Sequence, residues 1–278
     1  MSARVVVKLG GEVIRDAALG AVAAELAALA KQRSVVVVHG GGPQTTALQK
    51  ALGQTPNIVG GRRVTDAATL DAIKMAVAGQ ANVDLCAALT AAGAKPVGLH
   101  GASSAVIRAK QRPPRIYSGA GPDPVDLGHV GDVEGFDQGL LELLSGAGYL
   151  PVLACIGADS SGNVYNINAD IVATRVAAAL GASDLMALMD VPGVLANRDD
   201  PSTRFAKLCV AEAKQLIADG VVAGGMIPKL EESFVALEAG VPRVHLLNRG
   251  LAEAAASPGS VGTLLTNDSL AMIRSRSS

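Results

Sequence analysis

Two runs of β-branched residues that break into glycines lie near the start of the chain, and they limit its possible folds more than any other feature. Residues 5–11 read Val-Val-Val-Lys-Leu-Gly-Gly, and residues 35–42 read Val-Val-Val-Val-His-Gly-Gly-Gly. Continuous runs of this kind are typical of buried parallel strands, and ligands of α/β proteins bind beyond the carboxyl ends of such strands. We therefore expect two adjacent loops that present backbone N–H groups to an anionic ligand.

The composition agrees with an α/β fold that packs a sheet between helices. Of 278 residues, 49% are hydrophobic but only 2% are aromatic and none is Trp, so Ala, Val, Leu and Ile must fill the core. The 24 basic and 25 acidic residues nearly cancel. A chain with balanced charge is not expected to bind nucleic acid or an anionic membrane, and we expect a small-molecule partner instead.

The cysteines and the apolar runs indicate the cellular compartment of the protein. Cys86, Cys155 and Cys209 are far apart and show no CxxC spacing, which argues against a disulfide framework or a zinc site and favours small buried fillers. The first strand begins close to Met1, and no apolar run approaches ~18–20 residues without a charge. We therefore expect a cytoplasmic protein with no signal peptide and no membrane span.

The rest of the chain predicts alternating helices and strands in a single domain. Residues 105–134 differ, since they are rich in short extended pieces and turns, and we expect a β-hairpin excursion there that covers the site as a lid. No linker divides the chain, and residues 267–278 are expected to be frayed. The predicted helices are 17–31, 44–52, a long helix from Thr65 or Asp66 to about 92 that bends at Gly79, 137–146, 170–180, 210–219 and 227–239; the predicted strands are 34–39, 95–100, 149–156, 184–190, 243–247 and an edge strand near 263–265.

Several polar residues stand where a structural role alone is a weak explanation. Lys8 interrupts a buried strand and needs an anionic partner, although a lysine on an edge strand that reaches solvent is the alternative. Asn166, Asn168 and Asp170 alternate along an extended segment and would share one side, although Asp170 as a helix N-cap and the asparagines as turn formers are equally good explanations. Arg63 suits a carboxylate ligand, with a solvated arginine pair as its alternative.

Other patterns are absent or carry little information. No GxxxxGK[ST] P-loop and no GxGxxG after a strand is present, which disfavours the two common glycine-rich nucleotide sites. Lys229 on its own is typical of a surface lysine. The histidines have no spacing that suggests a catalytic triad or a metal site, and we assign them no catalytic role.

Seven motifs in order along nearly the whole chain resemble those of the amino acid kinase family. They are Lys8-Leu-Gly-Gly11, His39-Gly-Gly-Gly42, Gly61-Arg-Arg-Val-Thr-Asp66, Asp126-Leu-Gly-His-Val-Gly131, Asn166-Ile-Asn-Ala-Asp170, Asp190-Val-Pro-Gly-Val-Leu195 and Gly224-Gly-Met-Ile-Pro-Lys229. The resemblance implies a three-layer α/β/α sandwich with a mainly parallel central sheet. Its N-lobe, about residues 1–160, would bind N-acetyl-L-glutamate, and its C-lobe, about residues 161–266, would bind ATP with Mg²⁺.

The resemblance also implies a reaction, in which the γ-carboxylate of N-acetyl-L-glutamate is phosphorylated in the second step of arginine biosynthesis. Carried over by position, the residues implied as catalytic are Lys8, Lys229, Asp170 and Gly11. Those implied for the acetylated amino acid are Gly41, Gly42, Arg63, Asn166 and Asn168. Those implied for the nucleotide are Gly10, Asp190, Val191, Pro192, Gly193, Val194, Leu195, Val221, Val222 and Ala223; no side chain is expected to bind a metal directly.

Three departures from the family pattern leave details open. Arg62 stands where an apolar residue is usual, so the preference for the acyl amino acid is uncertain, and Met189 stands where Ser or Thr is common. The chain lacks the N-terminal helix associated with arginine-inhibited hexamers, which favours a homodimer without arginine feedback. The alternatives are a kinase for a related carboxylate, such as N-acetyl-aminoadipate or a carrier-linked amino acid, and a non-catalytic nucleotide-sensing member of the fold.

Overall fold

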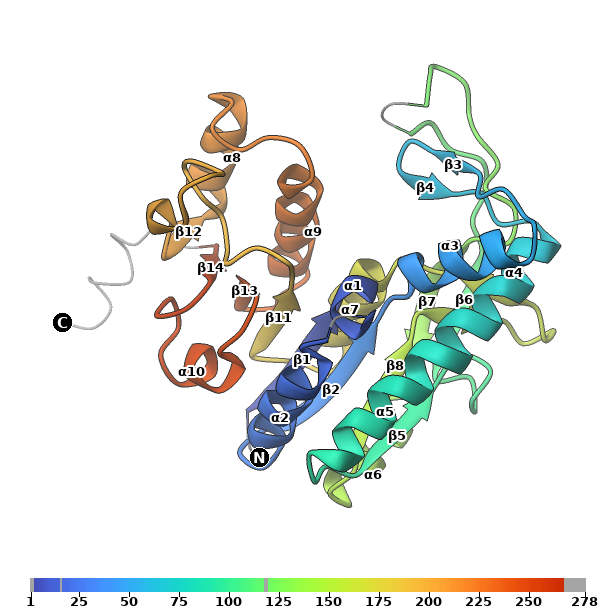
Figure 1. Cartoon of the computed structure of the whole chain (residues 1–278), viewed down its shortest axis with the longest axis horizontal. Helices are drawn as coiled ribbons and strands as arrows, with labels where there is room; N and C mark the ends of the chain where they lie inside the picture. The colour runs from blue at the N-terminus through green and yellow to red at the C-terminus, as the bar shows by residue number, and fades with distance from the viewer. Residues whose placement is uncertain (1–2, 16, 118–119, 268–278) are drawn as a thin grey trace.

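The computed structural model describes residues 3–15, 17–117 and 120–267, and it is built on one large, mostly parallel sheet (Figure 1). The strand order is β12-β14-β13-β11-β1-β2-β8-β5, and each neighbouring pair is parallel except β13 and β14. The strands are β1 (Arg4–Leu9), β2 (Ser34–His39), β5 (Pro96–Leu99), β8 (Leu150–Ala154), β11 (Asp184–Leu188), β12 (Lys207–Cys209), β13 (Arg243–Leu247) and β14 (Thr263–Thr266). The expected mainly parallel α/β fold is confirmed.

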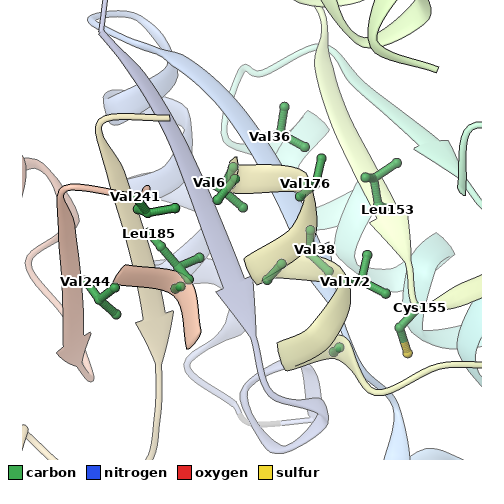
Figure 2. Packing of buried hydrophobic residues seen from close by; sticks show 14 of the residues in the cluster. Val6, Val36, Val38, Leu153, Cys155, Val172, Val176, Leu185, Val241 and Val244 are labelled. Carbon is green, nitrogen blue, oxygen red and sulfur yellow. The ribbon is translucent and has the colours of Figure 1, made fainter. Parts of the chain in front are cut away.

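The sheet lies between two helical layers, because successive side chains of its strands point to opposite faces. Val5, Val7 and Leu9 of β1 pack in one cluster with α2 (Leu19–Ala30), α5 (Asn82–Ala91) and α10 (Leu251–Ala256). Val6 packs on the other face with α6 (Gln138–Gly146), α7 (Ala169–Ala179), α8 (Val210–Ala218) and α9 (Met226–Glu238). Figure 2 shows Val172 and Val176 of α7 over the strands on this second face. The three-layer arrangement follows from these two clusters.

Two smaller sheets stand apart from the central one. The order β10-β9-β6-β7 joins β6 (Ile107–Gln111), β7 (Gly131–Phe136), β9 (Ile156–Ala158) and β10 (Val164–Asn166). Strands β6 and β7 are antiparallel, which confirms the predicted hairpin within residues 105–134. The other small sheet is an antiparallel hairpin, not predicted, that joins β3 (Ile58–Val59) to β4 (Arg62–Arg63).

The long helix predicted from residue 66 to about 92 is present, but its middle is wider than an α-helix. Asp66 caps α4 (Ala67–Ile73) by accepting a hydrogen bond from the Thr69 backbone N–H at 2.8 Å. A π-helical segment, η1 (Lys74–Ala81), contains Gly79 and leads into α5. Segments of π-helix are frequent at functional sites. Here η1 carries Val77, whose Cγ2 lies 2.8 Å from where a Cβ on Gly41 would be.

Some element boundaries differ from the prediction. Helix α3 (Gly42–Ala51) begins at the glycine loop itself, since Pro43 occupies its first turn, and the short α1 (Gly11–Arg15) follows β1 directly and was not predicted. The three cysteines are free, and Cys155 and Cys209 are buried as expected, while Cys86 is half-buried. A bilayer-spanning helix is absent from the described residues. Residues 268–278, where a frayed tail was predicted, lie outside the described residues.

Candidate active site

Lys8 lies in the interior of the sheet and is paired with a carboxylate. It points to the same face as Val6, toward α7, and its Nζ lies 2.7 Å from Asp170 Oδ1 in the first turn of that helix. The Lys8 side chain is only 9% exposed, so an unpaired ammonium there would be costly. The edge-strand alternative for Lys8 is therefore wrong, because β1 is central in the sheet.

Asn168 and Asp170 share the start of α7 but have different roles. Asn168 is the N-cap, and its side-chain oxygen accepts a hydrogen bond from the Asp170 backbone N–H at 2.9 Å. The alternative in which Asp170 is the N-cap is therefore wrong. Because Asn168 satisfies the helix terminus, the Asp170 carboxylate is available to Lys8.

Close packing excludes a side chain at one position in each glycine loop. A Cβ on Gly11 would lie 2.7 Å from Pro43 Cδ and 2.8 Å from Gln44 Oε1, and one on Gly41 would lie 2.8 Å from Val77 Cγ2. Gln44 also donates a hydrogen bond from Nε2 to the Gly11 carbonyl at 2.8 Å. These contacts hold the loops beside Lys8, as expected for a backbone-lined anion site.

A cavity of about 600 Å³ opens between these elements, and it is lined by all five residues predicted for the acetylated amino acid and by three of the four predicted catalytic residues. Cationic side chains on its wall (Lys8, Arg62, Arg63, Arg112, Arg115, Arg175) outnumber acidic ones (Asp132, Asp170, Glu232), which favours an anionic ligand. The predicted residues that line it are Lys8, Gly10, Gly11, Gly41, Gly42, Arg63, Asn166, Asn168 and Asp170.

Arg63 is fixed from several directions. Its guanidinium donates from Nη2 to Thr46 Oγ1 at 2.7 Å and to the Gly42 carbonyl at 3.3 Å, and from Nη1 to Gln49 Oε1. Burial lowers the pKa of Arg63. A guanidinium held in one orientation beside a glycine loop suits a carboxylate, and the solvated alternative for this arginine is wrong.

Lys229 lies on the other side of the Lys8–Asp170 pair. It is in the first turn of α9, and it lines a narrow cavity of about 20 Å³ together with Lys8, Asp170 and Met189. Burial and the charge of Lys8 lower the pKa of Lys229, while the carboxylates of Asp170 and Asp190 raise it. Two ammonium groups therefore converge on one aspartate, although only Lys8 reaches the large cavity.

The residues predicted for the nucleotide lie outside the large cavity, apart from Gly10. Residues 190–195 follow β11, and the Val194 backbone N–H donates to Thr263 Oγ1 at 2.9 Å. Gly193 has φ 144°, and a Cβ there would lie 2.6 Å from Thr263 Oγ1, so this turn requires glycine. Val221 is exposed and Val222 is buried just before α9. Their nucleotide role stays a prediction.

The sequence interpretation missed an arginine cluster in the wall of the large cavity. Arg112 and Arg115, at the base of the β6–β7 excursion, contact opposite oxygens of Asp132 at 2.8 and 2.6 Å. Tyr117 lines the same cavity, and Arg62 stacks over its ring at 4.8 Å. The sequence predicted this excursion as a lid but assigned no role to its side chains. Asp132, which follows the Asp126–Gly131 motif, was the one sequence feature that could have pointed to the arginines.

His39 supports the second glycine loop from behind. Its Nε2 accepts a hydrogen bond from Asn82 Nδ2 at 2.8 Å, and its Nδ1 lies 2.8 Å from the Gly40 carbonyl. The ring is fully buried, and burial lowers the pKa of His39 from 6.5 to about 4. His39 is therefore a neutral structural residue in the folded protein at neutral pH.

We expect His39 to make the protein less stable in mild acid. Between pH 6.5 and 4 the unfolded chain binds a proton at this position that the folded chain does not, so the free energy of unfolding falls as pH is lowered through this window. The loss should be about 2–3 kcal/mol between pH 7 and pH 4.5. Urea unfolding at several pH values should show this loss of stability in wild type and not in His39→Gln. His100→Gln keeps His39 and is the control, so it should lose stability as wild type does. The same pH dependence in His39→Gln as in wild type would contradict the role given to His39.

Comparison with known proteins agrees with this arrangement. The sequence profile of the amino acid kinase family matches residues 3–248. The chain belongs to the amino acid kinase family. The resemblance expected from the seven motifs is thus confirmed, and the Lys8–Asp170 pair and the glycine loops lie within the part of the chain that matches the family.

Individual members of the amino acid kinase family match over almost the whole chain. It is 59% identical to the acetylglutamate kinase of Sorangium cellulosum (strain So ce56), covering 94% of this chain and 93% of that protein. It is 52% identical to the acetylglutamate kinase of Anaeromyxobacter dehalogenans (strain 2CP-C), covering 94% and 98%. The solved structure of smu.665 from Streptococcus mutans UA159 superposes with a TM-score of 0.76 at 26% identity, covering 96% of this chain and all of that one (100%).

Proposed function

We propose that this protein phosphorylates the γ-carboxylate of N-acetyl-L-glutamate with ATP, which gives N-acetyl-L-glutamyl 5-phosphate and ADP in the second step of arginine biosynthesis. The observation that carries the proposal is the buried Lys8–Asp170 pair at 2.7 Å, in the wall of a cavity that also contains both glycine loops and the fixed guanidinium of Arg63. The identity of 59% to an acetylglutamate kinase supports the choice of substrate.

The acceptor fits the large cavity as a dianion. Arg63 would bind its α-carboxylate, and Asn166 at the end of β10 and Asn168 at the N-cap of α7 would hold the acetylated amino group. Asn166 is oriented for this by donating from Nδ2 to Thr65 Oγ1 at 3.1 Å. The γ-carboxylate would then lie near Lys8.

The reaction needs positioning and charge neutralisation more than it needs a base. A carboxylate is already ionised at neutral pH, and its oxygen attacks the γ-phosphorus while the bond from that phosphorus to the β–γ bridging oxygen breaks and ADP leaves. No proton has to move. Lys8 and Lys229 would stabilise the charge on the transferred group, and backbone N–H groups of Gly10, Gly11 and Gly41 would donate to it.

Asp170 would organise both lysines. It contacts Lys8 directly, and its carboxylate raises the pKa of Lys229 against the effects of burial and of the neighbouring ammonium. The carboxylate of Asp170 therefore offsets part of the repulsion between two ammonium groups in a partly buried site, where charges interact strongly. Asp170 has no bond-making role in this proposal.

ATP would bind on the Lys229 side, against residues 190–195 and 221–223. The carboxylate of Asp190 raises the pKa of Lys229, so the two charges lie close enough to interact. This supports a position of residues 190–195 beside the reacting phosphates. Within the described residues no group of three or more His, Cys, Asp or Glu could hold a metal ion. Mg²⁺ would enter with ATP, held by its phosphate oxygens, with Asp190 nearby. Bound Mg²⁺ supplies further charge neutralisation on those oxygens.

Acyl-phosphate trapping tests the substrate. With ATP, Mg²⁺ and hydroxylamine, N-acetyl-L-glutamate should give acyl-hydroxamate faster than N-acetyl-L-aminoadipate or N-acetyl-L-aspartate. Each of these differs from it by one methylene, so we expect a rate difference of about 10–200-fold. A preference for N-acetyl-L-aminoadipate would favour the related-carboxylate kinase. ATP binding without hydroxamate from any of the three would favour a non-catalytic member.

We further propose that the protein is a cytoplasmic homodimer. The proposed use of ATP supports the location. Two exposed apolar side chains support the dimer: Met75 in η1 and Val83 in α5 are 50% and 62% exposed, and α5 packs beside β5 at the open edge of the sheet.

Sedimentation velocity tests the dimer. We expect wild type to sediment as a dimer and Val83→Glu as a monomer, because a buried charge would oppose association. Leu143→Glu, on α6, changes an exposed leucine elsewhere and should leave the dimer intact. A monomeric wild type, or a dimer unaffected by Val83→Glu, would contradict this interface.

A further inference from the structure

Arg62 is the residue whose charge the proposed function leaves unexplained. It follows the turn of the β3–β4 hairpin, is exposed, and lines the large cavity next to Arg63. Its contacts are weak ones: the guanidinium stacks on Tyr117 at 4.8 Å and donates to the Gly60 carbonyl at 3.1 Å. Among the described residues no carboxylate lies within ion-pair distance of Arg62, in contrast to Arg112 and Arg115.

Glu232 faces the same cavity from the opposite side. It lies on α9, three residues after Lys229, so both side chains project from one face of the helix. It lines the large cavity together with Arg62 and the narrow cavity together with Lys229. Like Arg62, it has no ion-pair partner among the described residues.

The surrounding charges favour a specific partner for Glu232. Burial and the carboxylate of Asp170 raise the pKa of Glu232, while Arg62 and Arg112 lower it. Arg112 is already held by Asp132 at 2.8 Å and by the Gly131 carbonyl at 3.3 Å. Of the two arginines whose charge acts on Glu232, Arg62 is therefore the one that is free to move toward it.

We propose that Arg62 and Glu232 form an ion pair across the cavity when the acceptor binds, and that this pair positions Lys229 for phosphoryl transfer. The inference rests on the proposed function. The β3–β4 hairpin carries Arg62 next to Arg63, and α9 carries Glu232 one turn after Lys229, so the pair connects the acceptor-binding arginine to the second lysine. Both residues act through others and are positioning residues.

The pair is also compatible with the proposed preference for N-acetyl-L-glutamate despite the charge of Arg62. An unpaired guanidinium beside Arg63 would attract an additional carboxylate of a larger substrate. With Glu232 opposite, the charge of Arg62 is neutralised within the protein, and the cavity keeps Arg63 as its carboxylate ligand.

A double-mutant cycle on steady-state kinetics tests the pair. Arg62→Gln and Glu232→Gln should each lower kcat about fivefold to tenfold, with a smaller change in the KM of N-acetyl-L-glutamate, and the double variant should be no worse than either single variant. The exchange Arg62→Glu with Glu232→Arg should recover part of the lost kcat. Glu231→Gln, the neighbouring exposed glutamate, is the matched control and should match wild type.

Amide hydrogen exchange of the β3–β4 hairpin is a second measurement, and it reports whether the hairpin is held by the ion pair when the acceptor binds. Adding N-acetyl-L-glutamate should slow amide hydrogen exchange in residues 58–63 of wild type and do so less in Glu232→Gln. Additive losses in the double variant, or equal protection of the hairpin in Glu232→Gln, would overturn the pair while the kinase proposal stands. A wild type that does not turn over N-acetyl-L-glutamate would instead overturn the proposed function, and the pair with it.

Discussion

Replacing Lys8 with methionine is expected to lower kcat by about 10²–10³-fold, the effect of removing one preorganised electrostatic contact to the transferred group. The KM of N-acetyl-L-glutamate should change far less, because Arg63 and the asparagines would still bind the acceptor. Lys229→Met should behave in the same way, and the KM of ATP should rise more than in Lys8→Met. Hydroxamate formation at saturating substrates measures kcat, and calorimetric titration of N-acetyl-L-glutamate measures binding separately.

Methionine matches the Lys8 side chain as far as Cε in a position that is only 9% exposed, so the variant removes the charge while leaving at most a small cavity. Lys31→Met, on the exposed end of α2, is the matched control and should retain wild-type kcat. Nearly normal turnover in both Lys8→Met and Lys229→Met would mean that neither ammonium stabilises the transferred group. The role given to Asp170 would then lose its basis as well.

Gly41→Ala is expected to have the second largest effect. The new Cβ would lie 2.8 Å from Val77 Cγ2, too close for the loop and η1 to keep their positions. Displacing a loop that positions a reactant by about 1 Å can cost roughly 10²-fold in rate, and overpacking should lower the free energy of unfolding by about 1–3 kcal/mol. Steady-state kinetics and urea unfolding measure the two losses.

A second substitution makes the steric explanation testable. Val77→Ala removes the Cγ2 that the new methyl group would meet, so Gly41→Ala with Val77→Ala should recover a large part of the activity. Gly20→Ala, in α2 where no atom lies within 4 Å of the new Cβ, should keep full activity. If the Val77→Ala background gives no recovery, the loss in Gly41→Ala has another cause, such as a changed backbone conformation.

Much of the fold and part of the site were predictable because they depend on local patterns. The valine runs of β1 and β2 and their glycines predicted the central strands and the loops at their carboxyl ends. Lys8 could be selected because an ammonium in a buried strand requires an anion. Its partner could not be chosen from spacing alone, since the pairing of Lys8 with Asp170 depends on α7 crossing the same face of the sheet.

What the sequence did not predict depends on contacts between distant segments. Arg112 directly follows β6 and Asp132 lies in β7, and the pairing of these two strands brings them together. The π-helical η1 was predicted only as a bend at Gly79, because widening depends on how the helix packs against the glycine loop. No sequence pattern pointed to Glu232, because only the tertiary structure places it in the wall of the same cavity as Arg62.

The central claim is that ATP turnover by this protein requires N-acetyl-L-glutamate as the phosphoryl acceptor. A coupled assay of ADP release, run with ATP and Mg²⁺ and with or without N-acetyl-L-glutamate, tests it most directly. We predict little ADP release without the acceptor and a saturable, many-fold increase with it, which is lost in Lys8→Met. ADP release that is the same with and without N-acetyl-L-glutamate would contradict the account.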